Sequence, residues 1–176
     1  YQNDSYAQRY RDRLAQFRAA VPAAHADALT EVAAKALFKL MAFKDEYEVA
    51  RLHRDPAFAE MLAQEFEPGF KINYHMAPPI VSLRKDARGR PVKRAFGAWF
   101  TPVLTALSKL RPLRGTALDV FSYTQERREE VALIRWYEAL LAELPAKTGE
   151  STVKTVQELL ALPMDIRGYG PVKRAA

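Results

Sequence analysis

Apolar side chains recur at three- and four-residue spacings along most of the chain, which is the periodicity of amphipathic helices. Prolines, glycines and capping residues divide this pattern into separate elements. We therefore predict helices over residues 4–20, 27–54, 57–66, 97–110, 125–144 and 151–160.

A different pattern begins at Phe70, where apolar and polar residues alternate up to Met76. This alternation predicts a half-buried strand over residues 70–76. A second strand can form over residues 80–83, and the turn DARGRP then leads towards Phe96. Because two or three short strands are not stable alone, we expect their apolar face to pack on the helices.

The predicted fold class is mainly α. We expect a single-domain helical bundle over residues 1–176, with a small two- or three-stranded β-excursion around residues 70–96. A chain of 176 residues is long enough to bury a substantial core without disulfides or a structural metal.

The most distinctive stretch is LFKLMAFKDEYEVARLHR, residues 37–54, the second half of the longest predicted helix. Two adjacent apolar stripes leave it little polar surface, so it belongs at the centre of a bundle. One stripe consists of Phe38, Met41, Val49 and Leu52. Asp45 falls on that stripe. Because burying a lone carboxylate is costly, we predict that a basic side chain or helix-end amides meet Asp45.

Composition excludes several kinds of chemistry. The chain has no cysteine, so it holds no thiolate nucleophile, cysteine-ligated zinc or iron–sulfur cluster, and this composition fits a reducing cytoplasm. No apolar run approaches the roughly 18–20 residues that span a bilayer, and the first residues do not resemble a signal peptide, so we expect no membrane partner. The net charge of +6 could indicate nucleic acid, an anionic cofactor or an acidic protein surface, but no nucleic-acid-binding motif accompanies it.

No residue pattern indicates a metal site or an active site. His25, His53 and His75 lack metal-ligand spacing, and we interpret them as surface histidines. Asp45 and Glu48 could form a carboxylate pair for acid–base catalysis, but an internal salt bridge and a solvated helix residue explain them more simply. We therefore predict no catalytic, cofactor-binding or metal-ligating residue in this chain.

The segment 84–94 is strongly basic. Its cations are Arg84, Lys85, Arg88, Arg90, Lys93 and Arg94, against one acid, Asp86. It can be interpreted as a finger that contacts phosphate or an acidic neighbour, or as a solvated hairpin tip. The closing stretch adds Arg167 and Lys173, and it can dock on its own domain, dock on a partner or stay loose.

Several stretches, taken in order, resemble a known family. They are LFKLMAFKDEYEVARLHRDPAF, FKINYHMAPPI, GRPVKRAFGAW, LRGTALDVFSYTQERREE and LPMDIRGYGPVK. Together they are similar to the C-terminal domain of indolepyruvate ferredoxin oxidoreductases, in the 2-oxoacid:ferredoxin oxidoreductase family. The similarity extends over most of the chain from about Ala33 onward. The first thirty residues match only as a variable helix.

The resemblance implies a cytoplasmic parent enzyme that oxidatively decarboxylates aryl 2-oxo acids to acyl-CoA and reduces ferredoxin. Thiamine diphosphate, magnesium and 4Fe–4S clusters would lie in other domains of the parent. The partners of this chain would be other domains or subunits of that enzyme, with ferredoxin and CoA acting on the parent. The chain begins at Tyr1 rather than at methionine, so we expect a piece of such a polypeptide.

Three functions follow as hypotheses. The first is a noncatalytic domain that assembles the enzyme or covers its active-site module. The second is a domain of the same enzyme that binds CoA phosphates or the substrate carboxylate through residues 84–94. The third is a freestanding basic module that binds nucleic acid, for which charge alone is weak evidence.

Overall fold

The computed structural model describes residues 2–43, 45–77, 86 and 92–167. Contacts divide the chain into two compact units, unit 1 (Tyr1–Phe43 and Arg128–Ala176) and unit 2 (Lys44–Arg127). Over the described residues the fold is mainly helical with a small two-stranded sheet, which confirms the predicted fold class. The expectation of a single domain over residues 1–176 stays a prediction. No helix in the described ranges is long and apolar enough to cross a lipid bilayer.

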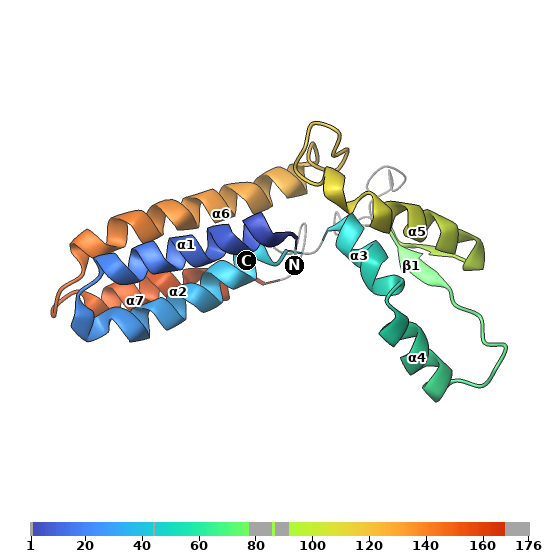
Figure 1. Cartoon of the computed structure of the whole chain (residues 1–176), viewed down its shortest axis with the longest axis horizontal. Coiled ribbons are helices and arrows are strands. Elements are labelled where there is room, and N and C mark those ends of the chain that lie inside the picture. The colour runs from blue at the N-terminus through green and yellow to red at the C-terminus, as the bar shows by residue number, and fades with distance from the viewer. Residues whose placement is uncertain (1, 44, 78–85, 87–91, 168–176) are drawn as a thin grey trace. The chain divides into compact units, whose positions relative to one another are not determined.

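Unit 1 is built on four helices that lie side by side (Figure 1). They are α1 (Asp4–Ala20), α2 (Ala26–Met41), α6 (Gln125–Glu143) and α7 (Val153–Ala161). Short 3₁₀ turns, η1 (Ala23–His25), η4 (Leu144–Lys147) and η5 (Leu162–Met164), precede or follow them. The first three residues of α6 belong to unit 2.

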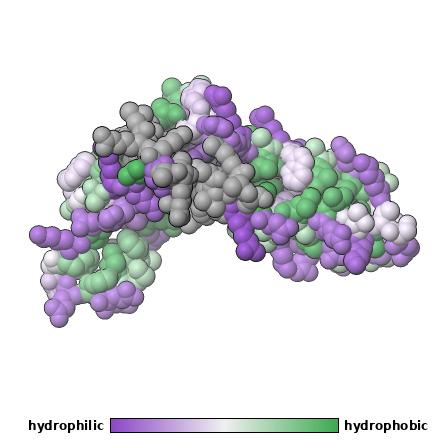
Figure 2. Space-filling view, turned by 180° about the vertical axis from the view of Figure 1, so that it is seen from behind, coloured by the Kyte–Doolittle hydropathy of each residue, from purple (hydrophilic) through white to green (hydrophobic). Residues whose placement is uncertain are grey.

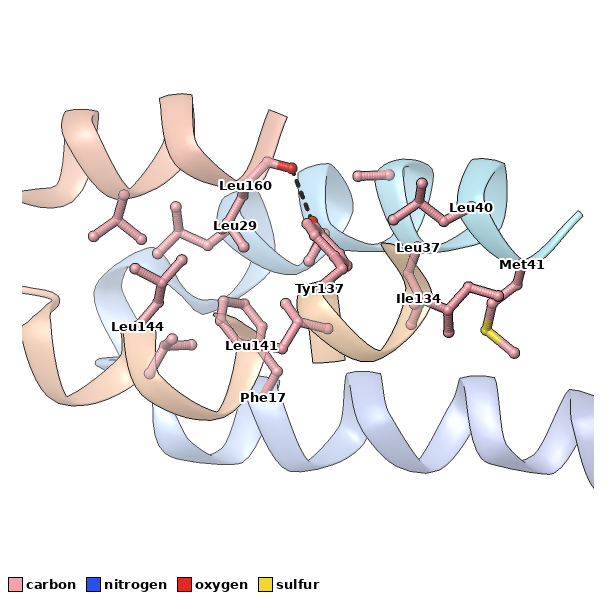
Figure 3. Close-up of a cluster of buried hydrophobic side chains, with 14 of the residues drawn as sticks. Phe17, Leu29, Leu37, Leu40, Met41, Ile134, Tyr137, Leu141, Leu144 and Leu160 are labelled. Atoms are coloured by element: carbon pink, nitrogen blue, oxygen red, sulfur yellow. Dashed lines mark hydrogen bonds between the residues drawn. The ribbon is translucent and has the colours of Figure 1, made fainter. Parts of the chain in front are cut away.

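Side chains from all four helices form the core of unit 1. Phe17, Leu37, Tyr137 and Leu160 are each almost completely buried there (Figure 3). The Tyr137 hydroxyl donates a 2.8 Å hydrogen bond to the carbonyl oxygen of Leu160, so the buried phenol keeps a partner. This bond and the surrounding apolar contacts join α6 to α7.

Polar contacts attach α1 to α2 and to α6. The hydroxyls of Tyr6 and Tyr10 donate to carbonyl oxygens in α2, at 3.1 and 3.2 Å. Arg9 Nε and Nη2 each donate a 2.7 Å hydrogen bond to a carboxylate oxygen of Glu138 in α6. The planar guanidinium matches both oxygens at once, which fixes the orientation of α1 as well as its position.

Unit 2 combines short helices with a two-stranded sheet. Its elements are α3 (Glu46–His53), α4 (Pro56–Glu65), β1 (Tyr74–Met76), β2 (Arg94–Phe96), η2 (Ala98–Phe100), α5 (Thr101–Lys109) and η3 (Arg111–Leu113). The strands are antiparallel, with Tyr74 opposite Phe96 and Met76 opposite Arg94. Tyr74 packs with Ala50 of α3 and Leu104 of α5 in a small core, so the sheet rests on helices as expected.

The predicted helix over residues 27–54 is wrong as a single element. α2 ends at Met41, and α3 begins at Glu46 after Asp45, whose backbone is extended (φ −127°, ψ 171°). Aspartate favours helix N-termini, where its carboxylate accepts backbone hydrogen bonds that are unavailable to it inside a helix. The predicted stripe is therefore broken. Phe38 is 61% exposed, and Leu52 is exposed as well.

Other boundaries lie close to the predictions. The N-terminal helix begins at Asp4 and ends at Ala20, as predicted, and Asn3 caps it. Pro102 lies in the first turn of α5. The strand predicted over residues 70–76 is limited to β1, and the possible strand over residues 80–83 lies outside the described residues. Trp99, which precedes α5, is 66% exposed.

Candidate functional site

A buried group of charges at the start of α3 is the most unusual polar feature of unit 2. We call it the Asp45 cluster. It consists of Asp45, Glu46, Arg114 and Arg127. The side chain of Asp45 is completely buried, as the sequence predicted.

Asp45 meets both kinds of partner that were predicted for it. Its Oδ1 accepts a 2.7 Å hydrogen bond from the backbone N–H of Glu48, which caps α3. The same oxygen accepts a 2.8 Å hydrogen bond from Arg114 Nη2, while Arg114 Nε forms an ion pair with Oδ2. The burial of Asp45 and its contact with a helix-end amide were thus predicted correctly, although the continuous helix from which its burial was inferred is interrupted.

Arg127 adds a second cation to the Asp45 cluster. Its Nη1 lies 3.5 Å from Asp45 Oδ2, and its Nη2 donates to Glu46 Oε2 at 3.3 Å. Burial raises the pKa of Glu46 above its ordinary value, although Arg127 acts in the opposite direction. Two arginines and two carboxylates therefore share a largely enclosed space, in which removing one charge would leave another without compensation.

A buried tyrosine and a buried aspartate continue the polar network. Tyr47 donates a 3.0 Å hydrogen bond to Asp119 Oδ1, and the guanidinium of Arg114 lies 5.9 Å from the centroid of the Tyr47 ring. Asp119 also accepts backbone hydrogen bonds from Gly115, at 2.9 Å, and from Phe121, at 3.1 Å. Gly115 has φ +74°, and this left-handed conformation turns the chain between Arg114 and Asp119.

The chemistry of this network is that of a structural site. Burial, reinforced by the hydrogen bond to Asp119, raises the pKa of Tyr47 to about 12. The phenol therefore stays protonated at neutral pH and acts as a hydrogen-bond donor, far from the pKa near 7 that favours a general base. The network holds α3 to the loop that follows α5.

Glu48 corrects one expectation. It is buried rather than solvated, and Arg51 donates hydrogen bonds to it from Nε, at 3.1 Å, and from Nη2, at 2.8 Å. Arg51 Nη1 also donates to Asp55 at 3.1 Å. Asp45 and Glu48 thus have separate arginine partners, which favours the predicted salt bridge for Asp45 over an acid–base pair.

The predicted basic contact residues are only partly described. Arg84, Lys85, Arg88, Arg90 and Lys173 lie outside the described residues. Lys93 and Arg94 are exposed next to and within β2, and Arg167 is exposed after η5. Arg167 belongs to unit 1, and Lys93 and Arg94 belong to unit 2.

The histidines lie in three different settings. His25 Nε2 is 3.2 Å from Glu150, and His75 is exposed on β1. His53 is half-buried against Tyr74 and Phe58, with ring centroids 5.4 and 5.7 Å away, so it is not a simple surface residue. Across the described part of the chain, no three histidine or acidic side chains come together in an arrangement that could hold a metal ion.

A shallow groove lies along α1 in unit 1. It has a volume of about 420 Å³ and is lined by Ser5, Gln8, Arg9, Asp12, Arg13 and Gln16. All six residues come from α1, and Arg9 is already bonded to Glu138. A groove with one wall and no buried polar group has no means of orienting a substrate.

Little in the sequence points to the partners of Asp45. Arg127 stands in the run QERREE, which has the composition of a solvated helix face, and Arg114 stands in a segment interpreted as a loop. One residue of the network, Asp119, could have been suspected of being buried, because it stands between apolar residues in TALDVF, shortly after a glycine. Pairing it with Tyr47 required contacts across 72 residues.

Comparisons with known proteins assign the chain to a family. Searches of the curated proteins and of the solved structures gave no match. One family model, described as "Family of unknown function (DUF6537)", covers residues 1–176, and the chain therefore belongs to that family.

Proposed function

We propose that this chain is a noncatalytic domain of an enzyme that resembles indolepyruvate ferredoxin oxidoreductases. It contributes to the assembly of that enzyme or covers its active-site module. The parent would convert aryl 2-oxo acids to acyl-CoA in the cytoplasm and reduce ferredoxin. Its thiamine diphosphate, magnesium and 4Fe–4S clusters would be bound by other domains.

The observation that supports a structural role is the meeting of two motifs in the Asp45 cluster. The stretch LFKLMAFKDEYEVARLHRDPAF supplies Asp45 and Tyr47, and LRGTALDVFSYTQERREE supplies Arg114, Asp119 and Arg127. Hydrogen bonds and ion pairs join these residues, and the partners lie 69 to 82 positions apart in the sequence. Their side chains are largely shielded from solvent. The residues that carry the resemblance thus stabilise the fold of unit 2.

Exposed apolar side chains on unit 2 support a role in assembly. Large apolar residues are open to solvent on α4, next to β2 and in the loop after η3, including Met61, Trp99 and Leu118. Grouped exposed apolar residues are typical of protein contact surfaces, whereas scattered ones are ordinary.

The decisive experiment compares the parent enzyme with and without this chain. Both samples are assayed for arylpyruvate- and CoA-dependent reduction of an electron acceptor, and their assembly state is measured. We expect the shortened enzyme to fail to assemble, or to assemble and turn over poorly. Normal assembly together with normal turnover would refute the proposal.

A second candidate function is binding of CoA phosphates or of the substrate carboxylate by residues 84–94. It is favoured by the exposure of Lys93 and Arg94, the two cations of this segment that the structure describes. Charge reversal at Arg88 and Arg90 separates the two candidates. A selective rise in the KM for CoA would support anion binding, whereas dissociation of the enzyme at unchanged CoA dependence would support assembly.

A further inference from the structure

The chain passes between the two units twice, and both passages are next to the Asp45 cluster. Unit 2 begins at Lys44 and ends at Arg127. Asp45 and Glu46 therefore follow the first passage directly, and Arg127 is the last residue before the second. Arg127 comes 81 residues after Glu46 in the sequence, yet their side chains are hydrogen-bonded. The two ends of unit 2 thus meet at this cluster.

Arg127 joins these two ends through charge. Its Nη1 lies 3.5 Å from Asp45 Oδ2, and its Nη2 donates to Glu46 Oε2 at 3.3 Å. The side chain of Arg127 is 10% exposed and that of Asp45 is completely buried, so water and salt screen this pair little. Separating the two ends would leave buried charges uncompensated. The ion pairs therefore oppose their separation.

The second passage runs inside a helix. α6 extends from Gln125 to Glu143, and Arg127 lies in its first turn. The backbone N–H of Arg127 donates to Thr124 Oγ1 at 3.3 Å, which caps the helix. Helix ends open more readily than helix centres, so a helix transmits a fixed orientation only while its first turn is held. The side chain of Arg127 holds this turn to the start of α3.

We propose that the Asp45 cluster is a clasp that fastens the two chain connections of unit 2 to each other and so restricts the movement of unit 2 against unit 1. While Arg127 pairs with Asp45 and Glu46, the first turn of α6 and the start of α3 move as one body. Opening of the clasp releases both connections together, and neither core has to unfold. Hinges consist of a few residues at the ends of elements, as these are.

Hydrogen exchange of the full chain tests the clasp itself. In Arg127→Gln we expect exchange at residues 45–49 and 125–128 to rise at least about tenfold, because both segments open together. Backbone N–H groups at Leu37 and Leu104, in the two cores, should keep their exchange rates. The response of residues 45–49 is the specific readout, because the substitution lies far from them in the sequence.

Distances between two spin labels test the movement. The chain has no cysteine, so labels can be attached at Ala59→Cys in α4 and Gln157→Cys in α7, one in each unit. Both positions are exposed. No residue of α4 is buried, and hydrophilic and hydrophobic side chains both reach its surface (Figure 2), so the label there replaces no core side chain. We expect the distribution of distances to be broader in Arg127→Gln than in the otherwise wild-type chain.

Arg51→Gln is the matched control. Arg51 also compensates a buried carboxylate, that of Glu48, and it pairs with Asp55, but neither partner belongs to the two connections. We expect this variant to leave exchange at residues 125–128 and the distribution of distances unchanged. It therefore separates the clasp from a general loss of stability in unit 2.

Glu46→Gln is a second, milder variant. The Glu46 side chain is 27% exposed, and Arg127 keeps its pair with Asp45 in this variant, so unit 2 should stay folded. We expect the same changes in exchange and distance as in Arg127→Gln, to a smaller extent. Circular dichroism checks the fold of every variant, and the milder variant decides if Arg127→Gln does not fold.

Two results would overturn the proposal. One is unchanged exchange at residues 45–49 or an unchanged distribution of distances when the clasp residues are replaced. The other is equal broadening in Arg51→Gln, because a general loss of stability would then explain the movement. None of these outcomes depends on the parent enzyme or its activity, so the clasp and the proposed function can fail separately.

Discussion

Asp45 shows how a single residue can determine the local chain path. Its carboxylate caps α3, pairs with Arg114 and lies near Arg127, while its side chain is completely buried. A helix passing through this position would remove the cap and direct the carboxylate elsewhere. The break between α2 and α3 therefore follows from the contacts that Asp45 makes.

Replacing Asp45 tests the energetic weight of these contacts. We expect Asp45→Ala to lower the free energy of unfolding by about 3–5 kcal/mol, because the buried arginines lose their main counter-charge. The measurement is urea unfolding, compared through midpoints at equal slope.

Asp55→Ala is the matched control for this substitution. Asp55 also caps a helix, accepting a 3.1 Å hydrogen bond from Ala57 N–H, but its carboxylate is partly exposed. We expect a loss of about 0.5–2 kcal/mol, the usual cost of removing a cap. Equal losses for the two variants would show that the buried ion pairs contribute little.

His53 should make the stability of unit 2 depend on pH. Burial lowers its pKa below the ordinary 6.5, so the folded state favours the neutral ring. Because the unfolded state binds a proton more readily, the neutral ring adds to the free energy of unfolding. This contribution is complete above pH 6.5 and is lost as the pH falls through the lowered pKa of His53. His53→Phe should keep the ring contacts with Phe58 and Tyr74 while reducing the loss of stability on acidification. Unfolding curves at several pH values between about 5 and 7 provide the measurement, and an unchanged pH dependence would contradict the assignment.

At the scale of elements, the loop after α5 is shaped by one glycine. Gly115 has φ +74°, and its backbone N–H donates to Asp119, so this turn places Arg114 and Asp119 in the same polar network. An added Cβ would meet no atom within 4 Å, so any cost of a side chain comes from the backbone alone.

Gly115→Ala should therefore destabilise unit 2 by about 1–2 kcal/mol, the cost of a left-handed conformation for an L-residue. Gly149→Ala provides the comparison. Gly149 has no positive φ, and the nearest atom to an added Cβ is Thr152 Oγ1 at 3.9 Å. We expect that variant to be neutral or slightly stabilising, because alanine restricts the unfolded chain. A neutral Gly115→Ala would mean that the turn can be formed in another way.

At the scale of the whole molecule, the two units have separate cores. The core of unit 1 includes Leu37 and that of unit 2 includes Leu104, and among the described residues none belongs to both clusters. The two tryptophans of the chain fall one in each unit, Trp136 in unit 1 and Trp99 in unit 2. Each unit therefore has its own fluorescent probe.

Leu37→Ala and Leu104→Ala test whether the units unfold independently. Each should cost about 2–5 kcal/mol through lost packing and a cavity. We expect Leu104→Ala to shift the unfolding curve reported by Trp99 and to leave the one reported by Trp136, with the reverse for Leu37→Ala. Trp99→Phe and Trp136→Phe backgrounds isolate the two signals. A common shift of both curves would instead support the single domain predicted from the sequence.

The sequence by itself determined the mainly helical class, most helix positions, a small β-excursion around residues 70–96 and the burial of Asp45. These features depend on local periodicity, capping and breaking residues, which act within a few positions of one another. The tertiary structure alone decided that Asp45 begins a new helix, that Arg114 and Arg127 are its partners, that Glu48 is buried, and that Phe38 and Trp99 are exposed. Each of these depends on residues tens of positions away. Packing and the cost of burying an unpaired charge determine which distant residues come into contact, and a local sequence pattern encodes neither of them.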